Sequence, residues 1–228
     1  MSTTQFRAAQ LPNYIILILY IITGSLGNLG AIDILAPQWI YLGAVNILAC
    51  LYFLFSDTAS VQEGLSKLTK STFIYVYLFY FIWSGLSYFY AINPTETLLN
   101  LPRLGNTFFA IFFCFLLLNG LENKIVFISR VFIGFLAFEL LSLYSDLFTQ
   151  LENNTFISIN LKGVAGNKNI TAASIAFKVP FVLYSIVTVR KRLFKFIFSF
   201  LLFTAVFAIS ILYARSAILS SFIVFLIF

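Results

Sequence analysis

The chain has 228 residues, of which 61% are hydrophobic and only 10% are charged, with a formal net charge of +6. Soluble domains carry about 25% charged residues, so this chain has too few to cover a soluble core with a polar surface. The positive charge does not indicate nucleic-acid binding, because the basic residues lie in short segments between long apolar runs. The sequence therefore predicts an all-α, polytopic transmembrane helical bundle and no nucleic-acid partner.

Eight apolar segments follow one another along the chain, and a run of ~20 such residues matches the ~30 Å hydrocarbon core of a bilayer. We expect transmembrane helices over residues 14–34, 38–55, 72–91, 104–121, 125–148, 168–188, 194–213 and 216–228. The last segment has 13 residues. At ~1.5 Å per residue it is shorter than the bilayer core. The sequence thus predicts seven or eight spans in a single transmembrane domain, 1–228, that forms the N-terminal part of a longer protein.

The distribution of basic residues predicts the orientation in the membrane. If the N-terminus is cytoplasmic, nine of the 14 basic residues lie on that side: Arg7, Lys67, Lys70, Lys124, Arg130, Arg190, Lys191, Arg192 and Lys195. Cytoplasmic loops are rich in Lys and Arg, so we expect the N-terminus in the cytoplasm. The longest external loop is then roughly 149–167.

Aromatic residues make up 19% of the chain. Trp39 with Tyr41, and Tyr88 with Tyr90, fall near the ends of expected spans. Such residues are typical of the belt at the membrane interface, and the alternative is a platform on which sugars stack.

Two residue types limit the chemistry. Cys50 and Cys114 both fall inside apolar runs, which is typical of buried apolar side chains rather than of a disulfide framework or a metal site. The chain has no histidine, the commonest general base and metal ligand. We therefore expect no metal site and no cofactor.

Polar residues inside the expected spans need a reason, because burying them in lipid is costly. Three sets recur at helical spacing or at a junction between spans: Glu139, Ser142, Asp146 and Thr149; Asn167, Thr171, Ser174 and Lys178; and Ser210, Tyr213 and Arg215. Glu139 and Asp146 are structural or functional intramembrane acids, and Glu139 could pair with a basic residue of a neighbouring helix. Lys178 either snorkels outward or lines a water-filled or anion-binding face.

Five basic residues fall on the expected outer side, where the topology rule predicts few: Arg103, Lys162, Lys168, Lys178 and Arg215. Guanidinium groups bind phosphate oxygens bidentately, and ammonium groups add point charge. A lipid-linked diphosphate in the outer leaflet is thus the expected partner. Arg215 alone could equally be an arginine at a turn between two helices.

Three stretches resemble the O-antigen ligase and O-antigen polymerase superfamily, in an order and spacing that cover most of the chain. Residues 163–180 resemble its Gly-x-x-x-Asn-x-Asn-x-x-Ala…Pro stretch, with Lys168 where many members have proline. Residues 209–228 resemble a span that ends in a turn centred on an arginine, here Arg215. Residues 84–109 resemble the first external loop.

The resemblance implies a multi-span, GT-C-like, metal-independent glycosyltransferase of the bacterial inner membrane. Such enzymes transfer a glycan from undecaprenyl diphosphate to a lipid A core or a growing polysaccharide, in lipopolysaccharide or other polysaccharide biosynthesis. By motif match Arg215 is the expected catalytic residue. The expected substrate-binding residues are Arg103, Asn167, Lys168, Asn169 and Lys178. The family's large external loop, with a further arginine and a histidine, should follow residue 228, so these residues alone would lack part of the active site.

Two other classes of function remain open. A small-molecule transporter or lipid flippase would use Glu139 and Lys178 as a coupling pair, although no paired Gly- or Pro-broken helices in two halves accompany them. In a membrane scaffold without chemistry, the outer basic residues would bind lipid headgroups only.

Overall fold

The computed structural model describes residues 3–26, 36–56, 58–153, 161, 163–164 and 166–227. Within these residues the regular structure is helical and no strand occurs, which confirms the predicted all-α fold. The end of the first expected span, Lys162 and the middle of the expected external loop lie outside the described residues.

The helical segments form two compact units. Unit 1 comprises Met1–Gly24 and Asn28–Glu122, and unit 2 comprises Ser25–Gly27 and Asn123–Phe228. Six helical segments are long and apolar enough to cross a membrane, which fits a membrane protein: Ala36–Leu54, Thr72–Phe89, Pro94–Asn119, Lys124–Glu152, Lys168–Thr188 and Arg192–Ile211. In the described parts of the first and last expected spans, the apolar helices are shorter and each begins before the expected start: Gln10–Ile22 and Arg215–Leu226. That all of these belong to one domain stays a prediction.

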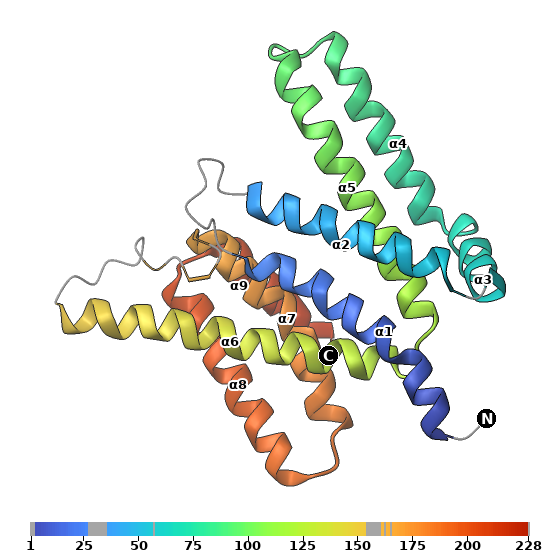
Figure 1. The fold of residues 1–228 in the computed structure, drawn as a ribbon. Helices are drawn as coiled ribbons and strands as arrows, with labels where there is room; N and C mark the ends of the chain where they lie inside the picture. The colour runs from blue at the N-terminus through green and yellow to red at the C-terminus, as the bar shows by residue number, and fades with distance from the viewer. Residues whose placement is uncertain are drawn as a thin grey trace. The chain divides into compact units, whose positions relative to one another are not determined.

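In unit 1 the helices surround one long central helix. The elements are α1 (Thr3–Ile22), α2 (Ala36–Leu54), α3 (Thr58–Thr69), α4 (Thr72–Leu86), the 3-10 turn η2 (Ser87–Phe89) and α5 (Pro94–Asn119), with a further 3-10 turn, η1 (Thr23–Ser25), after α1. Helix α5 contacts α1, α2, α3 and α4, and α4 runs beside it as an antiparallel neighbour (Figure 1). The position of every other helix in the unit is thus set against α5.

Helix α5 begins at Pro94, ten residues before the expected start at residue 104. Proline fits the first turn of a helix, because its fixed φ angle is helical and its missing N–H would have no partner there. The helix also continues through Pro102, where the sequence analysis placed a loop. The expected connection between the spans 72–91 and 104–121 therefore shortens to the few residues between Phe89 and Pro94, and the segment around Arg103 is helical.

Helix α3 lies in a segment that the sequence analysis treated as a loop. Val61, Leu65 and Leu68 recur at helical spacing, and Leu68 is buried. Gly64 lies so close to α5 that a Cβ atom there would approach Leu116 Cδ2 to 2.6 Å. A short amphipathic helix thus docks on α5 through a small residue, outside the expected spans.

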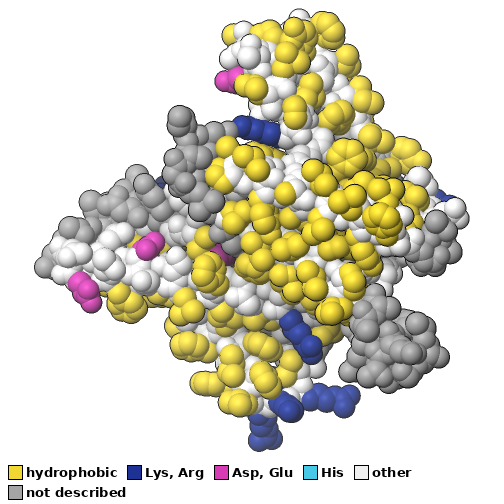
Figure 2. All heavy atoms as spheres, in the orientation of Figure 1, with side chains coloured by type: hydrophobic (Ala, Val, Ile, Leu, Met, Phe, Trp, Pro, Cys, Tyr) yellow, Lys and Arg dark blue, Asp and Glu magenta, His cyan; other side chains and the backbone are white. Residues whose placement is uncertain are grey.

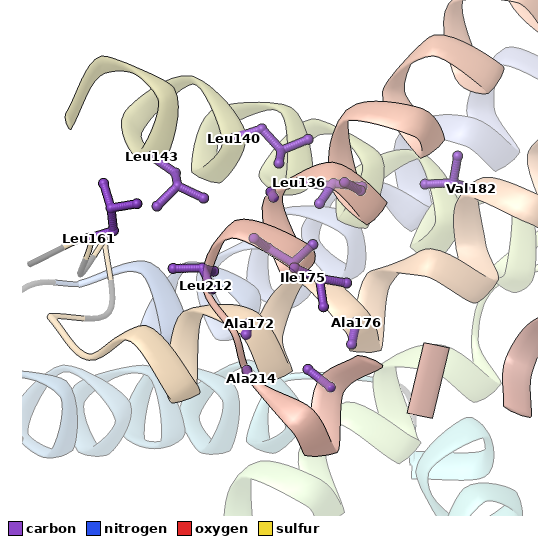
Figure 3. Packing of buried hydrophobic residues seen from close by; sticks show 14 residues of the cluster. Leu136, Leu140, Leu143, Leu161, Ala172, Ile175, Ala176, Val182, Leu212 and Ala214 are labelled. Atoms are coloured by element: carbon purple, nitrogen blue, oxygen red, sulfur yellow. The ribbon is translucent and has the colours of Figure 1, made fainter. Parts of the chain in front are cut away.

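Unit 2 is built around α7. Its elements are α6 (Lys124–Glu152), α7 (Lys168–Thr188), α8 (Arg192–Ile211) and α9 (Arg215–Ile227). Helix α7 contacts the other three, and both of its ends agree with the predicted ones. The core contains leucines and small residues, as Figure 3 shows for Leu136, Ile175 and Ala172. Alanines let the helices approach closely, as is typical of helix pairs in membranes.

Hydrophobic side chains cover much of the visible surface (Figure 2). Many large ones are exposed; Phe79 and Trp83 of α4, for example, are 67% and 57% exposed. Such a surface would be unfavourable in water but is expected against lipid tails. Basic side chains gather at the turn between α7 and α8, at the bottom of the view.

Candidate functional site

A chain of buried amide hydrogen bonds joins α1, α2 and α5. Tyr20 Oη donates to Asn46 Oδ1 at 2.8 Å, and Asn46 Nδ2 donates to the Asn106 backbone oxygen at 2.9 Å and to its side-chain oxygen. Asn106 Nδ2 in turn donates to the backbone oxygen of Trp39 at 3.1 Å. A buried polar group without a hydrogen-bond partner destabilises the folded state. These hydrogen bonds therefore fix the start of α2 against α5.

Arg103 lies one turn before Asn106 on α5, at the same end of unit 1. Its guanidinium carbon is 5.9 Å from the centroid of the Trp39 ring, a cation–π contact. Its Nη1 atom donates to Asn100 Oδ1 at 3.5 Å. The amide chain that holds Trp39 therefore also sets the surface on which the guanidinium rests.

A hollow of about 670 Å³ opens beside Arg103. The start of α2, the end of α4 and the first turns of α5 line it. Its lining includes the polar or aromatic side chains of Trp39, Tyr80, Ser84, Glu96, Asn100 and Arg103. The hollow thus offers hydrogen-bond donors and acceptors beside one cationic group.

A second hollow of about 840 Å³ adjoins the first, and Trp39, Leu101 and Arg103 line both. Its other lining side chains are mostly apolar, among them Ile40, Phe81, Leu98 and Phe109. Among the described residues, the buried Trp39 Nε1 has no hydrogen-bond partner. Arg103 therefore stands where a polar hollow meets an apolar one, an arrangement suited to a molecule with an anionic head and an apolar tail.

In unit 2, Glu139 of α6 and Lys178 of α7 form a buried ion pair. Lys178 Nζ is 2.8 Å from each carboxylate oxygen, and both side chains are 7% exposed. Ser174 Oγ donates to Glu139 Oε1 at 2.8 Å and lies 2.6 Å from Lys178 Nζ. The pairing of Glu139 with a basic residue of a neighbouring helix is thus observed.

This pairing bears on the expected role of Lys178. Among the described residues, Lys178 Nζ donates hydrogen bonds to Glu139 and Ser174, so its charge is neutralised inside unit 2 and does not face an open surface. An anion would have to compete with Glu139 for it. Substrate binding by Lys178 stays a prediction.

The Asn-x-Asn stretch lies at the beginning of α7. Asn167 has an extended backbone, and its side-chain oxygen accepts a hydrogen bond from the Asn169 backbone N–H at 2.9 Å. This is the N-cap contact that asparagine commonly makes, and it gives Asn167 a structural role. Lys168 is the first residue of the helix and is half-buried. Gly163 and Gly166, with φ angles of 56° and 69°, shape the approach to α7.

Arg215 is the first residue of α9 and is exposed. The turn before it includes Tyr213, which has a φ angle of 51°. Ala214 and Ala172, which flank the beginnings of α9 and α7, belong to one buried cluster (Figure 3). The beginnings of α7 and α9 therefore lie at the same end of unit 2. Asp146 is exposed on α6.

The structure thus brings some of the expected residues together and separates others. Glu139 touches Lys178, and the beginnings of α7 and α9 gather Asn167, Lys168, Asn169 and Arg215. Arg103 lies in the other unit. The sequence analysis missed Asn46, Glu96 and Asn106 as parts of a site, and it considered Trp39 only as an interfacial residue or as part of a platform for sugars. Asn46 and Asn106 carried a usable signal, because each is an amide inside an apolar segment.

Within the described residues no group of three or more His, Cys, Asp or Glu side chains could hold a metal ion. Cys50 and Cys114 are free thiols.

Comparisons with protein families, curated proteins and solved structures give no match to this chain. We therefore infer its function from the residues of the two units.

Proposed function

We propose that the protein transfers a glycan from an undecaprenyl-diphosphate carrier to a lipid or saccharide acceptor at the outer face of a bacterial inner membrane. The observation that carries this proposal is the pair of adjoining hollows in unit 1, one polar and one apolar, with Trp39, Leu101 and Arg103 common to both. A lipid diphosphate has an anionic head and a long apolar chain, which match the two linings. The resemblance to the O-antigen ligase and polymerase superfamily supports the same donor.

The proposed orientation places the N-terminus in the cytoplasm. Counting alternate spans from there, the start of α2, the end of α4 and the start of α5 all reach the outer face. These are the elements that line the polar hollow. The diphosphate head would then meet Arg103 at the outer interface while its chain stays in the bilayer.

Arg103 has the chemistry that the leaving group requires. A guanidinium can bind two phosphate oxygens at once, and it stabilises the negative charge that develops as the bond from the anomeric carbon to the diphosphate oxygen breaks. Its guanidinium carbon lies 5.9 Å from the centroid of the Trp39 ring. In this proposal Trp39 preorganises Arg103 for the anion.

In unit 2, Arg215 at the beginning of α9 and Lys168 at the beginning of α7 are proposed as diphosphate-binding residues. The support is the match of Arg215 to the family's arginine turn and its exposure at the beginning of α9. Under the same orientation the beginnings of α7 and α9 also reach the outer face. Asn167 and Asn169 would act there by shaping the start of α7.

The test compares surface glycan, by gel and blot, in cells that carry the gene for the wild-type protein, Arg103→Ala or Arg215→Ala. Membrane levels of each protein are matched. We expect Arg103→Ala to abolish long glycan because it removes the cation of the two hollows, and Arg215→Ala to do so because it removes the arginine that matches the family's turn.

The matched controls are Lys70→Ala in unit 1 and Arg130→Ala in unit 2, which remove exposed basic side chains that do not line the two hollows. Both controls should leave glycan unchanged. Unchanged glycan in Arg103→Ala would contradict the proposal that the two hollows bind the donor. Unchanged glycan in Arg215→Ala would mean that Arg215 is only a turn residue.

The buried pair of Glu139 and Lys178 favours a second candidate, a transporter or flippase. Ionisable residues inside membrane spans often mark ion or proton pathways, and here they contact each other across two helices. For this candidate the double variant Glu139→Gln/Lys178→Met should abolish uptake or lipid flipping in proteoliposomes. Unimpaired glycan synthesis in the same variant would favour it further, whereas normal transport would exclude the pair as a coupling site.

A further inference from the structure

Glu96 is the one acidic side chain that lines the polar hollow among the described residues. The other described acidic side chains either form ion pairs elsewhere or do not line the hollows. Glu63 pairs with Lys67, Glu139 pairs with Lys178, and neither hollow includes Glu122, Asp146 or Glu152. Among the described acids, Glu96 is therefore the carboxylate that this site offers.

The position of Glu96 on α5 relates it to Arg103. Glu96, Asn100 and Arg103 follow one another at steps of four and three residues, so they share one face of the helix, and all three line the hollow. At ~1.5 Å per residue, the seven residues from Glu96 to Arg103 span about 10 Å along the axis. Within the described residues Glu96 makes no hydrogen bond or ion pair, so its carboxylate oxygens are free to accept a proton.

We infer that Glu96 is the general base of the proposed glycan transfer. This inference depends on the proposed function and names the group that activates the acceptor. The acceptor hydroxyl oxygen bonds to the anomeric carbon, its proton passes to a Glu96 carboxylate oxygen, and the bond from the anomeric carbon to the diphosphate oxygen breaks. The diphosphate leaves with the electron pair, and Arg103 stabilises its charge.

The separation suits a direct displacement. In inverting glycosidases the two carboxyl groups lie about 6.5–9.5 Å apart, which leaves room for the attacking molecule between the base and the sugar. Glu96 and Arg103 stand two turns apart along α5, and both line the hollow in which the acceptor hydroxyl and the sugar ring would lie.

The experiment uses membranes from cells that express the full chain, with undecaprenyl-diphosphate-linked glycan as donor. It measures the transfer rate across pH and, separately, the binding of undecaprenyl diphosphate. Glu96→Gln should lower the rate about 10²- to 10⁴-fold, the usual contribution of a general base, with binding unchanged. Arg103→Ala should lose binding as well. Glu96→Asp keeps a carboxylate and should retain part of the rate, which separates a base from a structural role.

The pH profile adds a readout that a structural role would not change. The other titratable or charged side chains that line the hollow are Tyr80 of α4 and Arg103 of α5. Glu96→Gln should change the shape of the pH profile of the transfer rate, whereas a substitution that only disturbs packing should leave that shape as in the wild type.

The matched control is Glu63→Gln, an exposed glutamate of unit 1 that does not line the hollow. It should transfer as the wild type does. Glu96→Gln with a rate within twofold of wild type would overturn the inference while leaving the proposed function standing. Wild-type membranes that transfer no more than membranes lacking the protein would instead overturn both.

Discussion

The two units stabilise their interiors with different polar groups. Unit 1 uses neutral side chains, in which Tyr20, Asn46 and Asn106 pass hydrogen bonds across three helices. Unit 2 uses an ion pair, Glu139 with Lys178, between two helices. Neutral amides cost less to bury, whereas a buried charge that loses its partner is strongly unfavourable. The stability of unit 2 should therefore depend on one contact, and that of unit 1 on a chain of shared hydrogen bonds.

The largest expected effect comes from breaking the ion pair on one side. Lys178→Met leaves the Glu139 carboxylate buried without its cation, which should lower the free energy of unfolding by about 3–5 kcal/mol. Thermal unfolding in detergent micelles measures the loss. The double variant Glu139→Leu/Lys178→Met removes both charges and should recover most of the stability. A single variant as stable as the wild type would show that the pair does not stabilise unit 2.

The next effect should come from the amide chain. Asn106→Leu removes the side-chain acceptor of Asn46 Nδ2 and the side-chain donor to the Trp39 backbone oxygen, and it leaves only the backbone oxygen of residue 106 as an acceptor for Asn46. The expected cost is about 1–3 kcal/mol in the free energy of unfolding. Because the two amides share one network, Asn46→Leu/Asn106→Leu should cost less than the sum of the single variants. Additive losses in the same unfolding assay would mean that the two amides act independently.

A smaller effect is expected at the Trp39 ring. Trp39→Leu removes the cation–π contact with Arg103, an interaction of about 0.5–1 kcal/mol at exposed sites, so the affinity for undecaprenyl diphosphate should fall roughly two- to fivefold. Trp83→Leu is the matched control, because Trp83 is the only other tryptophan and lines neither hollow. Equal affinities for the two variants would contradict the role of Trp39 in holding Arg103.

The smallest effect concerns an exposed pair that belongs to neither interior. The Lys67 ammonium donates a hydrogen bond to Glu63 at 2.6 Å, and this hydrogen bond and charge lower the pKa of the Glu63 carboxyl. Because the pKa is lowered, the pair contributes to folding stability above the ordinary pKa of glutamate. This stability is lost as the pH falls through the lowered pKa. NMR titration should therefore give Glu63 a lower midpoint than in Lys67→Ala. Identical midpoints would show that the pair does not persist in solution.

Much of the fold followed from the sequence, because long apolar runs have few alternatives in a membrane. The ends of α7 were predicted correctly, since Asn167 provides a cap and the polar segment before it is distinct. The first ten residues of α5 were missed because Pro102 and nearby polar residues resemble a loop. Helix α3 was missed because the search sought runs long enough to span a bilayer, although Val61, Leu65 and Leu68 carried a helical pattern.

The site was less predictable than the fold. The polar faces of two expected spans pointed to Glu139 and Lys178, and their contact follows from the pairing of neighbouring spans. Trp39, by contrast, precedes Asn106 by 67 residues, and their contact depends on how α2 and α5 are aligned along their axes. No local sequence pattern encodes that alignment, so the position of Trp39 beside Arg103 could be found only from the three-dimensional structure.

The short connection between α7 and α8 has a consequence for how the protein is made. Only residues 189–191 separate two apolar helices of 21 and 20 residues, and the basic residues Arg190, Lys191, Arg192 and Lys195 lie at this turn. Two helices of similar length joined by so short a connection are expected to insert into the bilayer together as a hairpin. The charged turn then stays on the cytoplasmic side. A cysteine placed at Val189 should then react with an impermeant thiol reagent only from the cytoplasmic side, whereas labelling from outside would show that the hairpin inserts the other way.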